Sequence, residues 1–286
     1  ADQTSNDNDG TITGASWTGN GAPVTEAITA TNTHSLSFDG NDYVSVPSNS
    51  VYTVGDNYTI ETWINSSSSS LQSLIQGWYG FGFQIYLLAW GNIEFVLREP
   101  DGNRVGFSSS DFTLIPDGNW HHIAAVLNEE NVSVFVDGSL ETEGTFDNTV
   151  TGNGSDDLSF GHSPWASEYY SGLLDEIRIW NTALSESEIQ STMDNELNGD
   201  EDGLIGYWNF NEGTGSSILD LSGSNNNGTN NGAIWDTDVP PNAEKFYAKY
   251  VMIETDPEGE VPFEIVVTDS VGLVSDPVTQ TTDESL

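Results

Sequence analysis

The chain has no cysteine and very few basic residues. Without cysteine no disulfide can form, and the redox compartment of the protein cannot be inferred from cysteine pairing. Five Lys and Arg stand against 45 Asp and Glu, and the formal charge of −40 excludes a simple reader of the nucleic-acid phosphate backbone. No run of 18 apolar residues occurs, so no membrane-spanning helix is predicted.

The excess of acid also limits where such a chain can be stable. A charge of this size repels itself unless salt screens it or cations bind to it. A solvated acidic surface in salty surroundings and divalent cations bound at a few places are both compatible with it. No signal peptide is visible at Ala1, which fits a mature or excised segment.

What the chain does contain is typical of a β-sandwich with long polar loops. Aromatic residues make up 11% of it, including nine Trp, and there are 29 Gly. A disordered acidic tail would lack these aromatics. At 286 residues, one large β domain with additions, or two domains, is expected.

The most informative stretch runs from Leu158 to Gln190 and predicts a strand, an aromatic loop, a second strand and a helix start at Ser185. In the second strand, alternation places Asp175 on one face with Leu173, Ile177 and Ile179. If that face is the core face, Asp175 stands at the edge of a hydrophobic interior. Burying a lone carboxylate is costly, so it must find a cation or several donors.

Three segments carry a family resemblance: Ser35–Pro47, Asp117–Gly138 and Gly172–Ile189. In this order they resemble the bacterial laminin-G-like modules of the concanavalin A-like lectin/glucanase superfamily. The resemblance implies an all-β fold, a concanavalin A-like jelly-roll β-sandwich.

A calcium site is one interpretation of the acidic turn Asp39-Gly40-Asn41-Asp42. Turn formation alone also explains these residues. In the functional interpretation, Asp39, Asn41 or Asp42 joins Asp175 around a Ca²⁺ ion, because calcium takes oxygen ligands from carboxylates and loops.

The adjacent His121 and His122 are not expected to share an ion. Neighbouring residues in a strand face opposite ways, so both cannot easily reach one metal. No catalytic role is expected for them, because the resemblance implies a structural role for this histidine pattern.

Aromatic side chains supply the candidate ligand contacts. Trp78 and Tyr79, with Trp90, suit either a platform for stacking sugars or an ordinary core. The loop before Gly172 holds a second set: Trp165, Glu168, Tyr169 and Tyr170. In the distantly related pentraxins the equivalent loop can carry calcium and ligand contacts. Glu168 is the only acid between Gly161 and Gly172, so a pentraxin-type double calcium site is not expected.

An internal repeat marks the ends of the chain. Ala1–Trp17 aligns without gaps with Leu219–Trp235, which indicates a piece of a longer protein built from modules. We expect a laminin-G-like domain at 1–240, with 1–34 and 203–240 as related edge segments. Residues 241–286 resemble the last strands of a bacterial immunoglobulin-like (Ig-like) adhesin repeat and are too few for a whole domain.

Three functions follow as alternatives. The first is a non-catalytic, calcium-stabilised extracellular module for binding or adhesion, contacting glycans or cell-surface ligands. The second is a spacer or filament subunit completed by neighbouring copies. The third is a polysaccharide-degrading enzyme or its carbohydrate-binding module. An enzyme is not expected, because the Glu-x-Asp-x-x-Glu pattern of glucanases is missing and Glu141 and Glu143 fit a solvated loop.

Overall fold

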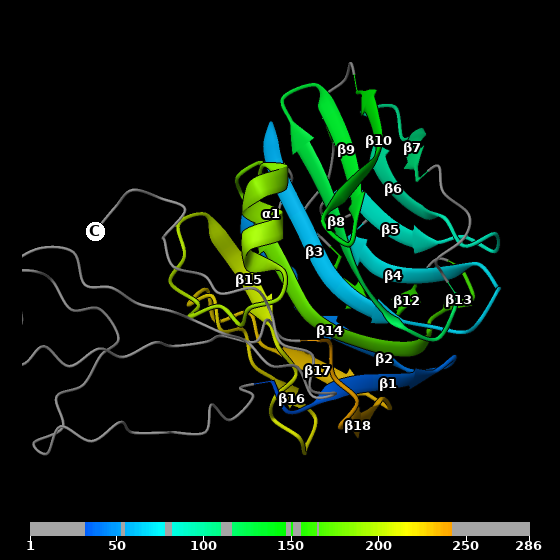
Figure 1. Cartoon of the computed structure of the whole chain (residues 1–286), viewed down its shortest axis with the longest axis vertical. Coiled ribbons are helices and arrows are strands. Elements are labelled where there is room, and N and C mark those ends of the chain that lie inside the picture. The colour runs from blue at the N-terminus through cyan, green and yellow to red at the C-terminus, as the bar shows by residue number, and fades with distance from the viewer. Residues whose placement is uncertain are drawn as a thin grey trace, which may run out of the picture. The chain divides into compact units, whose positions relative to one another are not determined.

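Two large antiparallel sheets pack face to face and enclose the hydrophobic core (Figure 1). The computed structural model describes residues 32–52, 55–77, 82–109, 116–146, 150, 156–164 and 166–241. All of them belong to one unit, residues 30–243. The expected Ig-like segment after residue 241 lies outside the described residues.

Sheet A has eight strands in the order β10-β9-β8-β3-β14-β1-β18, with β15 also paired to β14. Its strands are β1 (Ser35–Asp39), β3 (Asn57–Asn65), β8 (Trp120–Asn128), β9 (Asn131–Val136), β10 (Ser139–Thr145), β14 (Ser171–Trp180), β15 (Leu204–Trp208) and β18 (Ile234–Asp236).

Sheet B has eight strands in the order β16-β17-β2-β11-β4-β5-β6-β7. Its strands are β2 (Tyr43–Val46), β4 (Gln72–Gly77), β5 (Phe83–Leu87), β6 (Ile93–Arg98), β7 (Arg104–Ser108), β11 (Leu158–Phe160), β16 (Ser217–Ile218) and β17 (Gly228–Asn231). A separate two-stranded ribbon consists of β12 (His162–Ser163) and β13 (Glu168–Tyr169), and a short 3₁₀ turn, η1, spans Ser50–Tyr52.

Alternation along each strand divides core from outer face. In β5, for example, Phe83, Ile85 and Leu87 enter the core, while Gln84 and Tyr86 belong to the opposite face. The same pattern in both sheets produces one continuous core between them. The expected all-β jelly-roll sandwich is confirmed.

Strand β14 departs from simple alternation. Leu174 and Ile177 both lie in the core, and the pairing with β3 shifts between Asp175 and Arg178. Glu176, with a φ of 51°, is the additional residue of this bulge. The bulge changes the phase, so Asp175 lies on the outer face beside Trp63 and not on the isoleucine face that alternation predicted.

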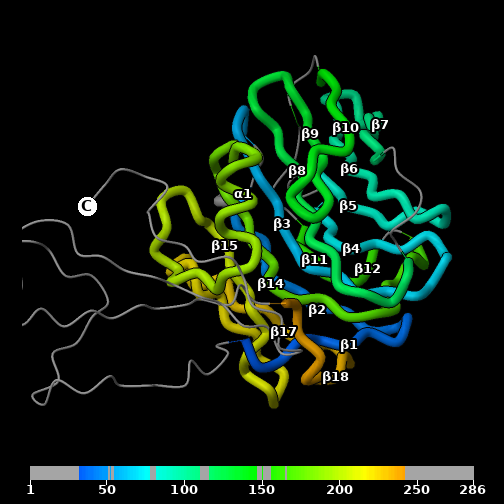
Figure 2. The backbone as a smooth tube through the Cα atoms, in the orientation of Figure 1, coloured from blue at the N-terminus to red at the C-terminus, as the bar shows by residue number. Residues whose placement is uncertain are grey.

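Helix α1 (Glu186–Thr192) covers part of the outer face of sheet A (Figure 2). Ser185 is its N-cap, as predicted, and Glu188 completes a capping box by binding back to the Ser185 backbone N–H. Ile189 packs against apolar side chains of β8 and β9. Within the described residues, no helix has the length and apolar character needed to cross a membrane.

The segment after α1 completes both sheets. β15 and β18 extend sheet A, and β16 and β17 extend sheet B. Residues 204–236 therefore belong to the same sandwich as the central strands.

Candidate functional site

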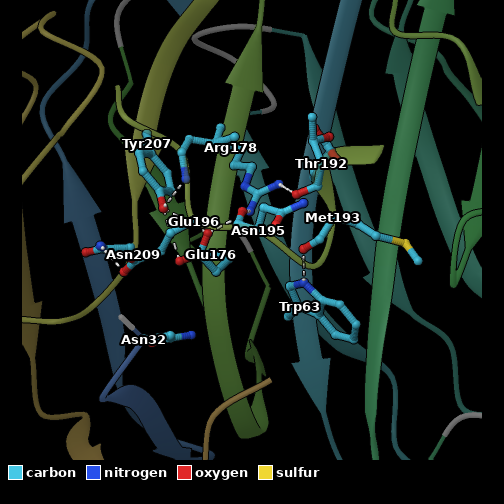
Figure 3. Close-up of polar contacts among 12 residues, drawn as sticks. Asn32, Trp63, Glu176, Arg178, Thr192, Met193, Asn195, Glu196, Tyr207 and Asn209 are labelled. Atoms are coloured by element: carbon cyan, nitrogen blue, oxygen red, sulfur yellow. Dashed lines mark hydrogen bonds and ion pairs between the residues drawn. The ribbon is translucent and has the colours of Figure 1, made fainter. Parts of the chain in front are cut away.

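The bulge in β14 creates a buried charged network on the outer face of sheet A, centred on Arg178 (Figure 3). The Arg178 guanidinium donates to the Glu176 carboxylate at 2.7 Å and to the backbone carbonyl oxygens of Thr192 and Asn195. The Tyr207 hydroxyl donates to the same carboxylate. Burial raises the pKa of Glu176, and the Arg178 charge opposes that rise.

A second carboxylate, Glu61, lies across the strand pair from Arg178. It is fully buried, accepts from the Trp180 indole N–H at 2.6 Å, and lies 3.2 Å from Nε2 of His122. Burial acts to raise its pKa, but His122, Arg178 and Trp180 together hold the pKa of Glu61 below its usual value.

Asp175 is fully buried at the edge of this network. Its carboxylate accepts from the Asn32 amide at 2.8 Å and from the backbone N–H of Glu176 at 2.8 Å. Burial, followed by the charge of Glu176, raises the pKa of Asp175 well above its usual range. The donors that the sequence required for this carboxylate therefore come from the protein itself.

These groups fasten the helical segment to the sheet. Arg178 binds two carbonyl groups at and after the end of α1, and the Trp63 indole donates to the carbonyl of Met193. Because Arg178, Glu61 and Asp175 are all fully buried, a ligand has no access to them. We assign the network a structural role.

The four residues predicted as calcium ligands do not form one site. The register of β1 and β14 places Asp39 opposite Ser171, four positions along the strand from Asp175. At roughly 3.3 Å per residue, that separates them by about 13 Å. Within the described residues, no group of three or more His, Cys, Asp or Glu could hold a metal.

The acidic turn keeps the geometry of a turn. The Asp39 carboxylate accepts from the Asn41 backbone N–H, and the Asp42 carboxylate accepts from the Asp39 N–H. Burial raises the pKa of Asp42, and the nearby Asp39 carboxylate adds to the effect. The two carboxylates lie close to each other at this turn, apart from Asp175.

His121 and His122 point to different partners, as strand alternation predicted. His121 lies 2.8 Å from Asp137 and 3.2 Å from Asp117, whereas His122 faces Glu61. The Asp137 hydrogen bond, against the opposing effect of burial, raises the pKa of His121.

Two neighbouring tyrosines predicted as ligand contacts have different environments. Tyr170 is fully buried, its ring meets Phe38, and its hydroxyl donates to the carbonyl of Asn65. It is a core residue, so its assignment to a contact surface is corrected. Tyr169, one residue earlier, is half-buried and stacks on the His162 ring with centroids 4.2 Å apart.

Tyr43 extends this stack across the sheet. Its ring centroid lies 5.2 Å from that of His162, and both side chains are half-buried. We call Tyr43, His162 and Tyr169 the aromatic cluster. The first comes from β2, and the others from the two strands of the β12–β13 ribbon.

A row of polar side chains crosses sheet B beside the aromatic cluster. Paired positions on four adjacent strands form it, and we call it the polar row: Ser45, Ser159, Gln76 and Gln84. The Gln84 amide donates to Gln76, and the Tyr86 hydroxyl donates to Gln84 at 3.0 Å. Polar groups thus occupy the outer face of the sheet whose inner face is core.

The predicted contact residue Glu168 lies at the border of this face. Burial raises the pKa of Tyr86 to about 12, and the Glu168 carboxylate adds to that rise. Glu168 Oε2 and Ser159 Oγ are buried and have no hydrogen-bond partner in the part of the chain that the structure describes. Arg104 lies over the Tyr86 ring, 5.7 Å from its centroid.

Trp78, Tyr79 and Trp165 lie outside the described residues. Sequence reasoning did not select Tyr43, His162 or the polar row. Alternation could have indicated the row, because Ser and Gln recur at outward positions between apolar residues. The contact between the β2 strand and the β12–β13 ribbon has no local sequence signal.

Comparisons with solved structures show the same fold in proteins of low sequence identity. One, from Bacteroides ovatus, is named as a candidate carbohydrate-binding protein. It is 20% identical over 74% of this chain, with a TM-score of 0.61. The chain spans 62% of that protein's length.

Two further structures share less of the fold. The pentraxin from Limulus polyphemus is 14% identical over 56% of this chain and 81% of its own, with a TM-score of 0.43. Domain 4 of an extracellular arabinanase from Geobacillus stearothermophilus, in complex with arabinotriose, is 21% identical over 55% of this chain and 75% of its own, with a TM-score of 0.45. No curated protein matches the chain.

The family comparison covers more than half of the sequence. The model of a laminin-G-type family described as the concanavalin A-like lectin/glucanases superfamily matches residues 38–190. These residues include most of Ser35–Pro47 and all of Asp117–Gly138 and Gly172–Ile189, the three segments that carry the resemblance. The chain belongs to the concanavalin A-like lectin/glucanase superfamily.

Proposed function

We propose that this protein is a non-catalytic carbohydrate-binding module whose ligand surface is the outer face of sheet B. The observation that carries the proposal is the aromatic cluster, three half-buried rings in contact beside the polar row. Ligand sites combine apolar or aromatic surface with a few placed polar groups, and this face has both.

The chemistry of a sugar fits this combination. Its apolar face packs on an aromatic ring, while its hydroxyls need both donors and acceptors, which amide, hydroxyl and carboxylate groups supply. Ser45, the half-buried member of the polar row, lies two residues from Tyr43 on the same face of β2 and presents a hydroxyl there. The candidate carbohydrate-binding protein from Bacteroides ovatus supports the fold of such a module, at 20% identity.

The first experiment is a glycan array with the full chain, followed by calorimetry on the best oligosaccharide. Replacing Tyr43 or Tyr169 with Ala should weaken binding by about tenfold or more, because a central aromatic contact is worth more than about 1 kcal/mol. Trp90→Ala is the matched control, since Trp90 is 78% exposed on the β5–β6 turn away from the cluster. Equal losses in all three variants would contradict this site.

A glycosidase remains the alternative to exclude, because two carboxylates lie near Tyr86 on the same face. Glu94 pairs with Tyr86 across the strands and is bound by Arg104 at 2.8 Å, and the Glu168 carboxylate is close enough to Tyr86 to contribute to its raised pKa. Hydrolysis needs two carboxylates facing one cleft. We expect no product in a reducing-sugar assay. Product formed by the wild type and lost in Glu168→Gln would contradict the non-catalytic proposal.

We further propose that the module acts outside the cell, in adhesion, with calcium bound at the β1–β2 turn. The acidic composition and the internal repeat support this setting. The closeness of the Asp39 and Asp42 carboxylates supports a cation at the turn. Neighbouring copies and cell-surface ligands are the partners to test alongside glycans.

A further inference from the structure

The polar row of sheet B continues from β2 onto β17 and β16, where it becomes exposed. Ser45 pairs with Thr229 of β17, and Thr229 pairs with Ser217 of β16. Residues opposite each other in antiparallel strands project from the same face, so these side chains share the outer face of sheet B. Thr229 and Ser217 are exposed and Ser45 is half-buried, whereas Ser159 is buried. The row is therefore open to a ligand on β2, β17 and β16, at one end of the sheet (Figure 1).

Asn231 borders these hydroxyl groups in a fixed orientation. It pairs with Tyr43 across the β17–β2 ladder, and both side chains are half-buried. Its amide nitrogen donates to Ser45 Oγ at 3.2 Å and to the Thr229 carbonyl at 2.9 Å. A carbonyl oxygen can only accept, so the amide nitrogen must face it and the amide oxygen cannot. Asn231 Oδ1 remains as an acceptor on the outer face.

Ser45 is oriented in a complementary way. Its Oγ accepts from Asn231, so its own hydrogen is left for donation. A donor and an acceptor thus stand side by side, next to the hydroxyl groups of Thr229 and Ser217. Each hydroxyl of a sugar ring both donates and accepts, so neighbouring hydroxyls suit such a pair. We call this set of side chains the uncharged strip: Ser217, Thr229, Ser45, Asn231 and Tyr43.

The uncharged strip contrasts with the composition of the chain. The protein has 45 Asp and Glu and a formal charge of −40, but none of the five side chains of the strip is charged at neutral pH. The arginines of sheet B, Arg98 and Arg104, lie on β6 and β7, at the other end of the strand order. An anionic ligand would be repelled by the whole molecule and would gain no ion pair from the strip. An uncharged ligand meets neither difficulty.

The strip runs across the strands. Neighbouring strands are about 4.8 Å apart, which is close to the length of one sugar unit in a linear chain. Successive units lying across the strands would meet Tyr43 and Ser45 on β2, then Thr229 on β17, then Ser217 on β16. A chain lying along β2 would meet only the first two.

We propose that the ligand of this module is a neutral, linear glycan that crosses β2, β17 and β16 on the uncharged strip. The inference rests on the proposed function, because Tyr43 belongs both to the aromatic cluster and to the strip. The Tyr43 ring packs on one sugar unit, and Ser45 and Asn231 bind its hydroxyls. Thr229 and Ser217 bind the units that follow. The length and charge of the glycan therefore determine affinity together with the aromatic contact.

Calorimetry with a disaccharide and a hexasaccharide of the best neutral glycan tests the direction of the chain. Thr229→Val keeps the size and branching of the side chain and removes its hydroxyl. It should weaken hexasaccharide binding by roughly threefold to tenfold and leave disaccharide binding unchanged, because a short ligand stays at Tyr43. Thr145→Val, the same change at an exposed position of β10 in sheet A, is the matched control and should bind like the wild type.

Asn231→Ala should weaken binding of both ligands, because it removes Oδ1 and the hydrogen bond that orients Ser45. Thermal unfolding of each variant shows whether its fold is retained. Equal affinity of Thr229→Val and the wild type for the hexasaccharide would overturn the proposed path of the chain.

Charge gives a second readout. Binding of the neutral hexasaccharide should change by less than about twofold between low and high NaCl, because no ion pair is screened. The same glycan with its primary alcohols oxidised to carboxylates should bind about tenfold or more weakly at low salt, and NaCl should narrow the difference. Equal or tighter binding of the oxidised glycan would contradict a neutral ligand.

The outcomes separate this inference from the proposed function. If Tyr43→Ala and Tyr169→Ala weaken binding but Thr229→Val and Asn231→Ala do not, the module binds glycans at the aromatic cluster and the strip is not part of the site. If only anionic glycans bind, the inferred ligand class is wrong while the proposed function stands. Absence of binding to every glycan would overturn both.

Discussion

Buried charges at single positions decide how helix α1 is held on the sheet. Arg178 neutralises Glu176 and lies near Glu61, and it also binds carbonyl groups of the segment that follows the helix. Asp175, the carboxylate that the sequence singled out, obtains its donors from Asn32 and its own neighbour. The Asn32 side-chain amide thus supplies part of the stabilisation of the Asp175 carboxylate that a cation was expected to supply.

Removing Arg178 should be severely destabilising. Arg178→Met leaves the buried Glu176 and Glu61 carboxylates without their cation, and loss of one partner of a buried pair costs about 3–5 kcal/mol. Urea denaturation measures this. Arg104→Met is the matched control, because the Arg104 side chain is 55% exposed, whereas that of Arg178 is 1% exposed. It should cost less than about 1 kcal/mol. Similar losses in both variants would contradict the role of Arg178.

Asp175 should make stability fall as pH rises. Its pKa in the folded protein lies well above the usual value of an aspartate, so above about pH 4 the folded state binds more protons than the unfolded state. The free energy of unfolding then decreases through the window between those two pKa values. Asp175→Asn should remove this dependence and stabilise the protein at neutral pH, because Asn32 Oδ1, unpartnered among the described residues, can accept from the new amide.

Denaturation of Asp175→Asn between about pH 4 and 8 provides the test. Asp200→Asn, at an exposed position, removes the same formal charge from the chain and is the control. If both variants changed the pH dependence equally, general charge repulsion and not Asp175 would be the cause.

The stability of helix α1 depends more on its N-cap and on its contacts with sheet A than on its length. It has seven residues, too few for an isolated helix to be stable in water. Its capping box satisfies backbone N–H groups at the first turn, and Ile189 anchors it on β8 and β9. The β12–β13 ribbon is likewise held by side-chain contacts with the neighbouring sheet B.

Ser185→Ala should destabilise the protein by about 1 kcal/mol, because the side chain that accepts from the Glu188 backbone N–H is lost. Ser191→Ala, within the same helix, should be close to neutral, since Ala favours the helix more than Ser. Thermal unfolding of the two variants gives the comparison. A larger loss in Ser191→Ala would contradict the capping assignment.

The whole molecule carries a formal charge of −40, and its stability should depend on ionic conditions. Raising NaCl from about 0.01 to 0.5 M should increase Tm, because salt screens repulsion between acidic groups. At equal ionic strength, calcium bound at the β1–β2 turn would raise the free energy of unfolding further. The increase would be about 2.7 kcal/mol when free calcium is in hundredfold excess over Kd.

Asp42→Asn distinguishes the two ionic effects. This substitution should abolish the rise in Tm that is specific to calcium and leave the rise in Tm caused by NaCl unchanged. Magnesium at matched ionic strength is a further control. Identical melting of the wild type in calcium and in chelator, at one ionic strength, would contradict a calcium site.

Much of the fold could be predicted from local patterns. Apolar alternation located the central strands, and Ser185 as an N-cap residue located the start of α1. The residues of the candidate site were harder to predict from local patterns. Tyr169 and Tyr170 are adjacent and chemically alike, and only packing against Phe38 shows that Tyr170 belongs to the core.

The sequence by itself determined the all-β class, the family, the opposite orientations of His121 and His122, and the helix cap, because each depends on short-range periodicity or on a contiguous motif. Tertiary structure alone decided the face on which Asp175 lies, its distance from Asp39, and the meeting of Tyr43 with His162. A bulge of one residue reverses strand phase, and register and sheet contacts join positions far apart in the chain, so local patterns do not contain them.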